Sequence, residues 1–177
     1  MNTLDTIYSR KSIRSFTGDP VSDATLNEIL KAAKAAPVGM GQFENVHLTV
    51  ITNKELLGKI NTAGAALFGN PKAVPLYGAP QFILVSVKKP EPGRENVSYS
   101  NAAGIVENMA LAATDLGAGA CHIWGAVMAL SHQPDLVTAL ELPEGFIPAC
   151  GLVVCETSDS YSVRNVDTGK IGVNYLK

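Results

Sequence analysis

The sequence contains little charge for its length. Only 17% of its 177 residues are Asp, Glu, Lys or Arg, whereas soluble domains average about 25%. The 14 basic and 16 acidic residues leave a net charge of −2, which argues against a broad nucleic-acid-binding surface. Hydrophobic residues make up 46% of the chain, enough for a sizeable core, so wholesale disorder is excluded. We infer that part of the weakly charged surface is covered, in an oligomer or against a cofactor.

Long apolar runs and cysteines are also scarce. No apolar run reaches the roughly 20 residues that a membrane-spanning helix needs, and residues 1–14 lack the apolar stretch of a secretory signal. Cys121, Cys150 and Cys155 are odd in number and lack CxxC spacing, which argues against a disulfide framework or a thiolate zinc site. All three lie in apolar stretches, so we expect buried, reduced thiols in a cytoplasmic protein that has no membrane partner.

Several familiar site motifs are absent. The stretch Gly117-Ala118-Gly119 lacks the third glycine of a dinucleotide fingerprint, and it follows a helix and enters a strand, which is the reverse of the required order. The sequence has neither a GxxxxGK(S/T) phosphate loop nor a GxSxG elbow. Its three histidines do not have zinc-protease spacing, so we expect no metal site.

The hydrophobic pattern predicts helices and strands that alternate only in places. We expect helices over Thr3–Ser9, from an N-cap at Ser22 to a break at Pro37, from an N-cap at Asn53 through Ile60, over Asn101–Leu116 and over Pro134–Leu140. We expect strands over Val46–Ile51, Gln81–Val87, Ala120–Trp124 and Ile147–Cys155, with limited pairing near Pro148. This order favours a three-layer α/β or an α+β arrangement over a pure doubly wound sheet. The length suits one domain.

The predicted helix over Asn101–Leu116 is unusually apolar. Its only charged residues are Glu107 and Asp115. Because it is apolar on most faces, we expect it to be buried nearly all round. A partner subunit should cover part of it, which predicts a homodimer.

The sharpest local feature is the run Arg10-Lys11-Ser12-Ile13-Arg14. In an extended chain, Arg10, Ser12 and Arg14 project to one side, and Lys11 and Ile13 project to the other. Two guanidinium groups and a hydroxyl suit a phosphate, because guanidinium matches phosphate oxygens in pairs. A solvated basic turn is the alternative reading of the same run.

Four motifs together resemble the FMN-dependent nitroreductase family. Residues 10–14 resemble its R-x-S-x-R opening, and Ala35-Ala36-Pro37 resembles its A-x-x-A-P turn. The stretch Asn70-Pro71-Lys72 resembles its Asn-x-x-Lys stretch, one residue shorter, and residues 101–119 resemble its central helix and glycine-rich turn. The matches keep the family order over roughly residues 5–155.

This resemblance implies an α+β fold of three layers, with a mostly antiparallel central sheet flanked by helices. It implies a single FMN-binding domain over residues 1–177, in an intertwined homodimer with FMN at the subunit interface. Carried over by position, Arg10, Ser12 and Arg14 would hold the phosphate and ribityl end of FMN, with Lys11 in the same segment. Arg164 would be a late basic residue that reaches the phosphate.

The resemblance also assigns residues to the flavin ring. Asn70 would hydrogen-bond the polar edge of the isoalloxazine ring, and Lys72 would lie near that edge. The stretch Ile123-Trp124-Gly125 would lie against the ring. Alternatives stay open: Trp124 packs in the core or an interface, His122 is structural or a proton donor, and Asn108 satisfies a polar partner across the dimer.

The sequence departs from the family in two places. Residues Val38–Glu44 replace the family's Asn and Gln-Pro-Trp, and Gly41 falls where the Asn would stand, so we expect that side-chain contact to the cofactor to be absent. Between Lys88 and Asn101 there is little room for the helical insertion that covers the flavin in longer members. These departures predict an open or differently lidded site.

The resulting prediction is an FMN-dependent oxidoreductase that uses NAD(P)H to reduce an electron-poor acceptor such as a nitroaromatic or a quinone. Because the flavin carries the redox chemistry in such enzymes, no catalytic side chain is assigned. A flavin-binding protein without NAD(P)H turnover, acting as a sensor, store or partner module, is the alternative that the short chain and the altered turn motivate. A family relative with specialised chemistry, such as reductive dehalogenation, is a third possibility.

Overall fold

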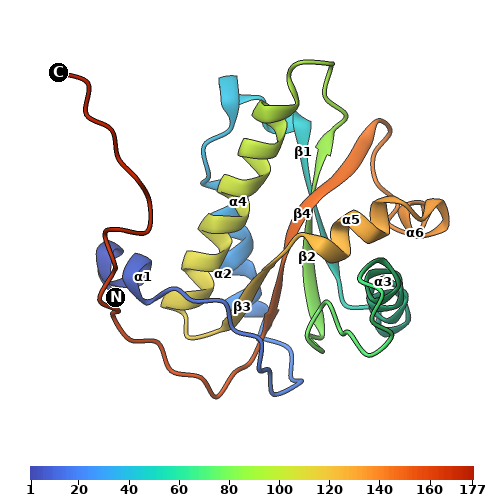
Figure 1. The fold of residues 1–177 in the computed structure, drawn as a ribbon. Coiled ribbons are helices and arrows are strands. Elements are labelled where there is room, and N and C mark those ends of the chain that lie inside the picture. The colour runs from blue at the N-terminus through green and yellow to red at the C-terminus, as the bar shows by residue number, and fades with distance from the viewer.

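The computed structural model describes residues 1–177 as helices around one antiparallel sheet (Figure 1). Its four strands pair in the order β1-β2-β4-β3, and every pair is antiparallel. The strands are β1 (Val46–Ile51), β2 (Gln81–Lys88), β3 (Gly119–Ile123) and β4 (Phe146–Cys155). The helices are α1 (Thr3–Ser9), α2 (Asp23–Lys34), α3 (Lys54–Leu67), α4 (Glu95–Asp115), α5 (Gly125–Ser131) and α6 (Pro134–Thr138). None of them combines the length and apolar character needed to cross a bilayer.

Helices cover both faces of the sheet. In Figure 1, α1, α2 and α4 lie on one side of it, and α3, α5 and α6 lie on the other. The central strand β2 serves both layers because successive side chains alternate between faces. Ile83 and Val85 pack with α2 and α4, while Phe82 and Leu84 pack with α3 and α5. The predicted α+β fold of three layers is confirmed.

Side-chain caps explain where two helices begin. The Ser22 hydroxyl accepts a hydrogen bond from the backbone N–H of Thr25 (3.1 Å) at the start of α2. The Asn53 side chain accepts from the N–H of Leu56 (3.0 Å) at the start of α3. Both caps were expected, because these side chains satisfy first-turn N–H groups that have no partner within the helix.

Several element boundaries were wrong. Helix α3 continues to Leu67, seven residues beyond the expected Ile60. Helix α4 begins at Glu95, six residues before the expected Asn101. Its N-cap residue, Arg94, makes no side-chain capping bond, so the usual sequence signal of a helix start is missing. Strand β3 ends at Ile123, and Trp124 is instead the N-cap residue of α5, a short helix that the pattern did not reveal.

The pairing of β4 is irregular at its proline, as expected. Val85 lies opposite Cys150, whereas the next residue of β2, Ser86, lies opposite Pro148. The ladder therefore passes over Ala149. Proline has no N–H to donate, and a bulge is one of the few places where a strand tolerates it.

Helix α4 is buried on only part of its circumference within one chain. Seven of its residues are buried: Ala102, Ile105, Val106, Met109, Ala110, Ala113 and Thr114. Ala103 is exposed, and Tyr99 remains 45% exposed. Burial nearly all round is therefore not reached by one chain. Asn108 has its partner within the chain, because its side-chain amide donates to the carbonyl of Ala32 at the end of α2 (3.3 Å).

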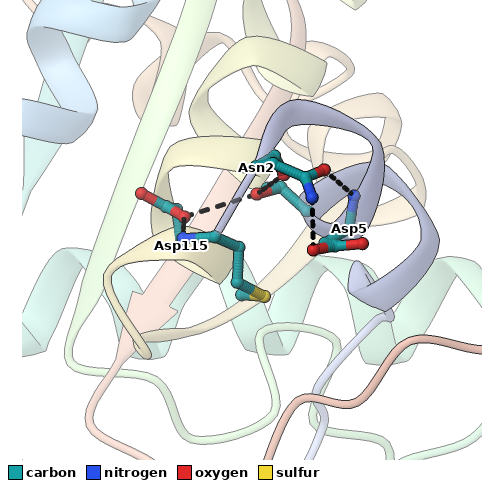
Figure 2. Close-up of polar contacts among 5 residues, drawn as sticks. Asn2, Asp5 and Asp115 are labelled. Atoms are coloured by element: carbon teal, nitrogen blue, oxygen red, sulfur yellow. Dashed lines mark hydrogen bonds and ion pairs between the residues drawn. The ribbon is translucent and has the colours of Figure 1, made fainter.

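The N-terminus is tied to the far end of α4 (Figure 2). The α-amino group lies 2.6 Å from the carboxylate of Asp115, and the Thr6 hydroxyl donates to the same oxygen (3.3 Å). Asn2 caps α1 by accepting from the N–H of Asp5 (2.9 Å). These contacts orient the segment that leaves α1. Residues 156–177 form neither helix nor strand.

Candidate functional site

The segment that follows α1 lies against β3, an outer strand of the sheet. The N–H of Ile13 donates to the carbonyl of Ala120 (2.9 Å), and the Ile13 side chain is buried. Residues 10–14 do not form a strand. This backbone bond and the buried isoleucine hold the segment at the sheet edge, so its basic side chains lie where three parts of the chain meet.

Arg10 contacts a carboxylate on α4. Its Nε lies 3.4 Å from Oε1 of Glu107, whose Oε2 lies 3.0 Å from Nε2 of His122 on β3. All three side chains are partly exposed: 26% for Arg10, 45% for Glu107 and 41% for His122. The hydrogen bond from His122 and the charge of Arg10 hold the pKa of Glu107 below its ordinary value, so this carboxyl is ionised at neutral pH.

Arg14 contacts an aromatic residue instead. Its Nε donates to the phenol oxygen of Tyr77 (3.3 Å), and its guanidinium carbon lies 5.6 Å from the centre of the Tyr77 ring. Tyr77 belongs to the loop over residues 69–80, between α3 and β2. Its φ of 55° lies in the left-handed region that side chains rarely adopt.

The two arginines do not project together. Glu107 belongs to α4 on one face of the sheet, whereas Tyr77 belongs to the loop that follows α3 on the other (Figure 1). The segment crosses the sheet edge between Arg10 and Arg14, with Ser12 partly buried between them. Strict alternation in an extended chain predicts a common side for these side chains; instead, Arg10 and Arg14 contact partners on opposite faces of the sheet.

Lys11 and Arg164 connect the segment to the tail. The Lys11 ammonium lies 3.2 Å from the carboxylate of Asp159 and 5.9 Å from the ring centre of Tyr161. Arg164 donates from Nε to the carbonyl of Tyr8 (2.8 Å) and from a terminal nitrogen to the carbonyl of Arg10. The structure therefore brings Arg10 and Arg164 together, although they are far apart in sequence.

The loop with Asn70 and Lys72 begins beside the start of α5. The Asn70 side chain accepts from the N–H of Lys72 (3.1 Å), and both residues are exposed. Phe68, two residues earlier, packs on Gly125 so closely that a Cβ there would lie 2.5 Å from the Phe68 ring. A larger residue there would have to displace the half-exposed Phe68 ring, and this contact places the end of α3 against Gly125.

The residues of the stretch 123–125 differ in how accessible they are to a ligand. The Ile123 side chain is 4% exposed and belongs to the core, whereas Trp124 is 65% exposed. Any contact from Ile123 would therefore come from its backbone. Trp124 lines an apolar groove of about 730 Å³ between α4, α5 and β4, together with Tyr99, Ala103, Met128, Pro148 and Cys150. A groove of this volume and character suits a small aromatic molecule.

Three site residues were missed or left undecided from the sequence. Tyr77 carried no signal, because a tyrosine in a loop is common. Glu107 did carry one, since a carboxylate on an almost uncharged helix needs a partner. His122 was left open between a structural and a proton-donating role, and its partner Glu107 became visible only in the structure.

The same fold occurs in solved oxidoreductases. A nitroreductase with bound FMN from Bacteroides fragilis superposes with a TM-score of 0.80 and 26% identity, over 99% of this chain and 100% of that one. A nitroreductase with bound FMN from Desulfitobacterium hafniense gives a TM-score of 0.81 at 24% identity, over 97% and 96%. The fold is therefore that of the nitroreductase class of oxidoreductases.

The sequence matches the same class. The model of the Nitroreductase family matches residues 7–154. An FMN reductase [NAD(P)H] from Bacillus subtilis is 29% identical over 170 residues, and the match spans 88% of this chain but only 66% of that protein. The chain belongs to the Nitroreductase family and is an oxidoreductase. Arg164 lies beyond the matched residues, whereas the other predicted site residues lie within them.

Proposed function

We propose that the whole chain works as one FMN-binding unit in the cytoplasm, and that it uses NAD(P)H to reduce an electron-poor acceptor such as a nitroaromatic or a quinone. The observation that carries this proposal is the hydrogen bond from the Arg164 guanidinium to the backbone carbonyl of Arg10 at the sheet edge. It joins residues 154 apart in sequence and holds a second guanidinium at the basic segment. Guanidinium groups suit the phosphate of a cofactor.

The donors at this edge fit a phosphomonoester. Glu107 contacts Arg10 through Nε, so the terminal nitrogens of that guanidinium remain available to a second anion. Ser12 adds a hydroxyl in the same segment. We assign Arg10, Ser12 and Arg164 to the phosphate end. Arg14, held on Tyr77, would add its positive charge to the phosphate end, and Lys11 would act only through the local positive charge, because it pairs with Asp159.

The ring end would be held by the loop and by the start of α5. Asn70 offers an exposed amide, and Lys72 offers an exposed cation that would stabilise negative charge on a reduced ring. The exposed indole of Trp124 and the backbone of Ile123 and Gly125 would cover one ring face and exclude water. When bound, FMN supplies the electron transfer, and these residues supply position and electrostatics.

We propose that two chains form a homodimer. The exposed outer face of α4, with Tyr99 and Ala103, and the apolar groove beside Trp124 form a continuous apolar surface that a second copy would cover. Light scattering or sedimentation at low micromolar concentration tests this. A dimeric mass supports the proposal, and a monomeric mass contradicts it.

The functional proposal is tested by absorbance spectroscopy. The purified protein, as isolated or after addition of FMN, should show a bound-flavin spectrum. Anaerobic addition of NADH or NADPH should then bleach it, and a nitroaromatic or quinone should restore it. Flavin that binds but is reduced by neither nucleotide supports the alternative of a flavin-binding protein without turnover. No flavin binding contradicts both.

The phosphate assignment needs a separate test with variants. Arg10→Ala should weaken FMN binding at least about tenfold, because it removes a charge-assisted contact. Arg14→Ala should also weaken binding. Arg94→Ala is the matched control, since Arg94 is exposed and pairs only with Glu91 at 4.0 Å. Unchanged FMN affinity in both site variants would reject the assignment.

A further inference from the structure

Glu107 lies between two groups of the candidate site that come from different parts of the fold. One carboxylate oxygen faces Nε of Arg10 at 3.4 Å, and the other faces Nε2 of His122 at 3.0 Å. Glu107 and Asp115 are the only charges over residues 101–116, and Asp115 is engaged by the N-terminus instead. An otherwise apolar helix therefore directs a single carboxylate at the proposed phosphate site.

This carboxylate has two opposing effects on phosphate binding. It orients Arg10 by engaging the Nε edge of the guanidinium, which leaves the terminal nitrogens for the ligand. Its own negative charge, however, repels a phosphate brought to the same arginine. Orientation is useful only if that charge is balanced when the ligand arrives.

His122 is placed to balance it. An ionised carboxylate only accepts hydrogen bonds, so the Nε2 atom of His122 that faces it carries the hydrogen. In the neutral ring, Nδ1 is then the free acceptor, and it is open to solvent because the side chain is 41% exposed. Protonation turns the contact into an imidazolium–carboxylate pair of zero net charge, without moving either group.

We propose that Glu107 is a positioning residue for Arg10, and that binding of a phosphate ligand at Arg10 is coupled to uptake of one proton at Nδ1 of His122. This inference rests on the proposed function, because the ligand is the FMN phosphate. The charged group that contacts the pair is Arg10 from the N-terminal segment, and Arg164 from the tail bonds the Arg10 carbonyl. Tyr161, whose hydroxyl donates to the Ala118 carbonyl (2.7 Å), stays neutral because burial raises its pKa. Lys11 is paired with Asp159.

Calorimetric titration with FMN tests the coupling. Titrations near neutral pH, in buffers of different ionisation enthalpy, count the protons taken up per FMN. Affinity is followed by quenching of FMN fluorescence at pH 6, 7 and 8. The native chain should take up more protons per bound FMN than His122→Gln does. Between pH 6 and pH 8, the FMN affinity of the native chain should fall about tenfold further than that of His122→Gln. The phosphate of FMN titrates in this range too, and because the same free ligand is used with both proteins, the contribution of the free phosphate cancels in the comparison.

Glu107→Gln separates positioning from simple structural support. Glutamine retains an oxygen that accepts from Arg10 but loses the opposing charge, so FMN affinity at pH 8 should rise. Glu107→Ala should lower affinity at every pH. The matched control is Glu28→Gln on α2, whose exposed carboxylate pairs with Lys31 at 3.5 Å, and it should behave as the native chain does. Riboflavin, which lacks the phosphate, should show no extra proton uptake.

The outcomes are distinguishable. FMN binding by the native chain with the same proton uptake and pH dependence as His122→Gln overturns this inference and leaves the proposed function standing. Lowered affinity of Glu107→Gln at pH 8 overturns it also. Absence of FMN binding by the native chain at every pH overturns the proposed function and this inference with it. Circular dichroism and the thermal midpoint establish that each variant is folded.

Discussion

The guanidinium of Arg14 lies against the ring of Tyr77, with Nε 3.3 Å from the phenol oxygen and the central carbon 5.6 Å from the ring centre. This contact joins residues 63 positions apart in sequence. It links the N-terminal basic segment to the loop that carries Asn70 and Lys72. This arginine–tyrosine pair is therefore one of the contacts that set the spacing between the proposed phosphate end and the proposed ring end of the site.

Replacing Tyr77 should weaken FMN binding. Tyr77→Ala removes both the hydrogen bond and the cation–π contact, which is worth about 0.5–1 kcal/mol at an exposed site, so affinity should fall about two- to fivefold. Tyr77→Phe keeps the ring and should lose less. The backbone strain at φ 55° is shared by all three residues and does not bias the comparison. FMN fluorescence quenching measures the three affinities, and equal loss in Phe and Ala would assign the effect to the hydroxyl alone.

Gly151→Ala should destabilise the fold. Gly151 lies in β4, packed against the Phe82 ring, and a Cβ there would lie 2.7 Å from the carbonyl oxygen of Ile83. Because a backbone oxygen gives way only if the strands separate, the free energy of unfolding should fall by about 1–3 kcal/mol or more. Gly58→Ala is the control: its Cβ would meet no atom within 4 Å, and alanine in an exposed helix interior should add up to about 1 kcal/mol. Urea unfolding of both variants should show a lower free energy of unfolding for Gly151→Ala and a higher one for Gly58→Ala.

Loss of the α3 cap should lower stability modestly. Asn53→Ala removes the acceptor for the N–H of Leu56, so the free energy of unfolding should fall by about 1 kcal/mol. Asn53→Asp keeps an acceptor and should retain most of the stability that the cap contributes. Thermal unfolding followed by circular dichroism compares the two, and an unchanged midpoint in the alanine variant would show that the cap contributes nothing measurable.

The thiols should react slowly in the folded protein. Burial raises the pKa of Cys150 to about 11. At pH 8, about one Cys150 thiol in a thousand is therefore ionised. The fraction of reactive thiolate rises about tenfold per pH unit until the pH reaches this pKa. Cys121 and Cys155 are buried. Reaction with a chromogenic disulfide at pH 8 should therefore be slow, and guanidinium should release three fast thiols. One fast thiol in the folded chain would contradict this.

Much of the fold was predictable because its signals are local. The caps at Ser22 and Asn53 and the β-branched run over residues 81–87 each act within a few residues, so elements could be recognised from them. The early start of α4 and the whole of α5 were not predictable, because both begin without a side-chain cap. Their helical state comes from packing against the sheet and against neighbouring helices.

The sequence by itself determined the apolar content, most of the elements, the family motifs and the basic run at residues 10–14. Tertiary structure alone decided what those residues touch: Arg10 meets Glu107 on one face of the sheet, Arg14 meets Tyr77 on the other, and Arg164 returns to the Arg10 carbonyl. The physical reason is that residue type sets the charge and hydrogen-bonding capacity of a side chain. Its partner is set by strand order and helix packing, which bring together groups that are distant in sequence.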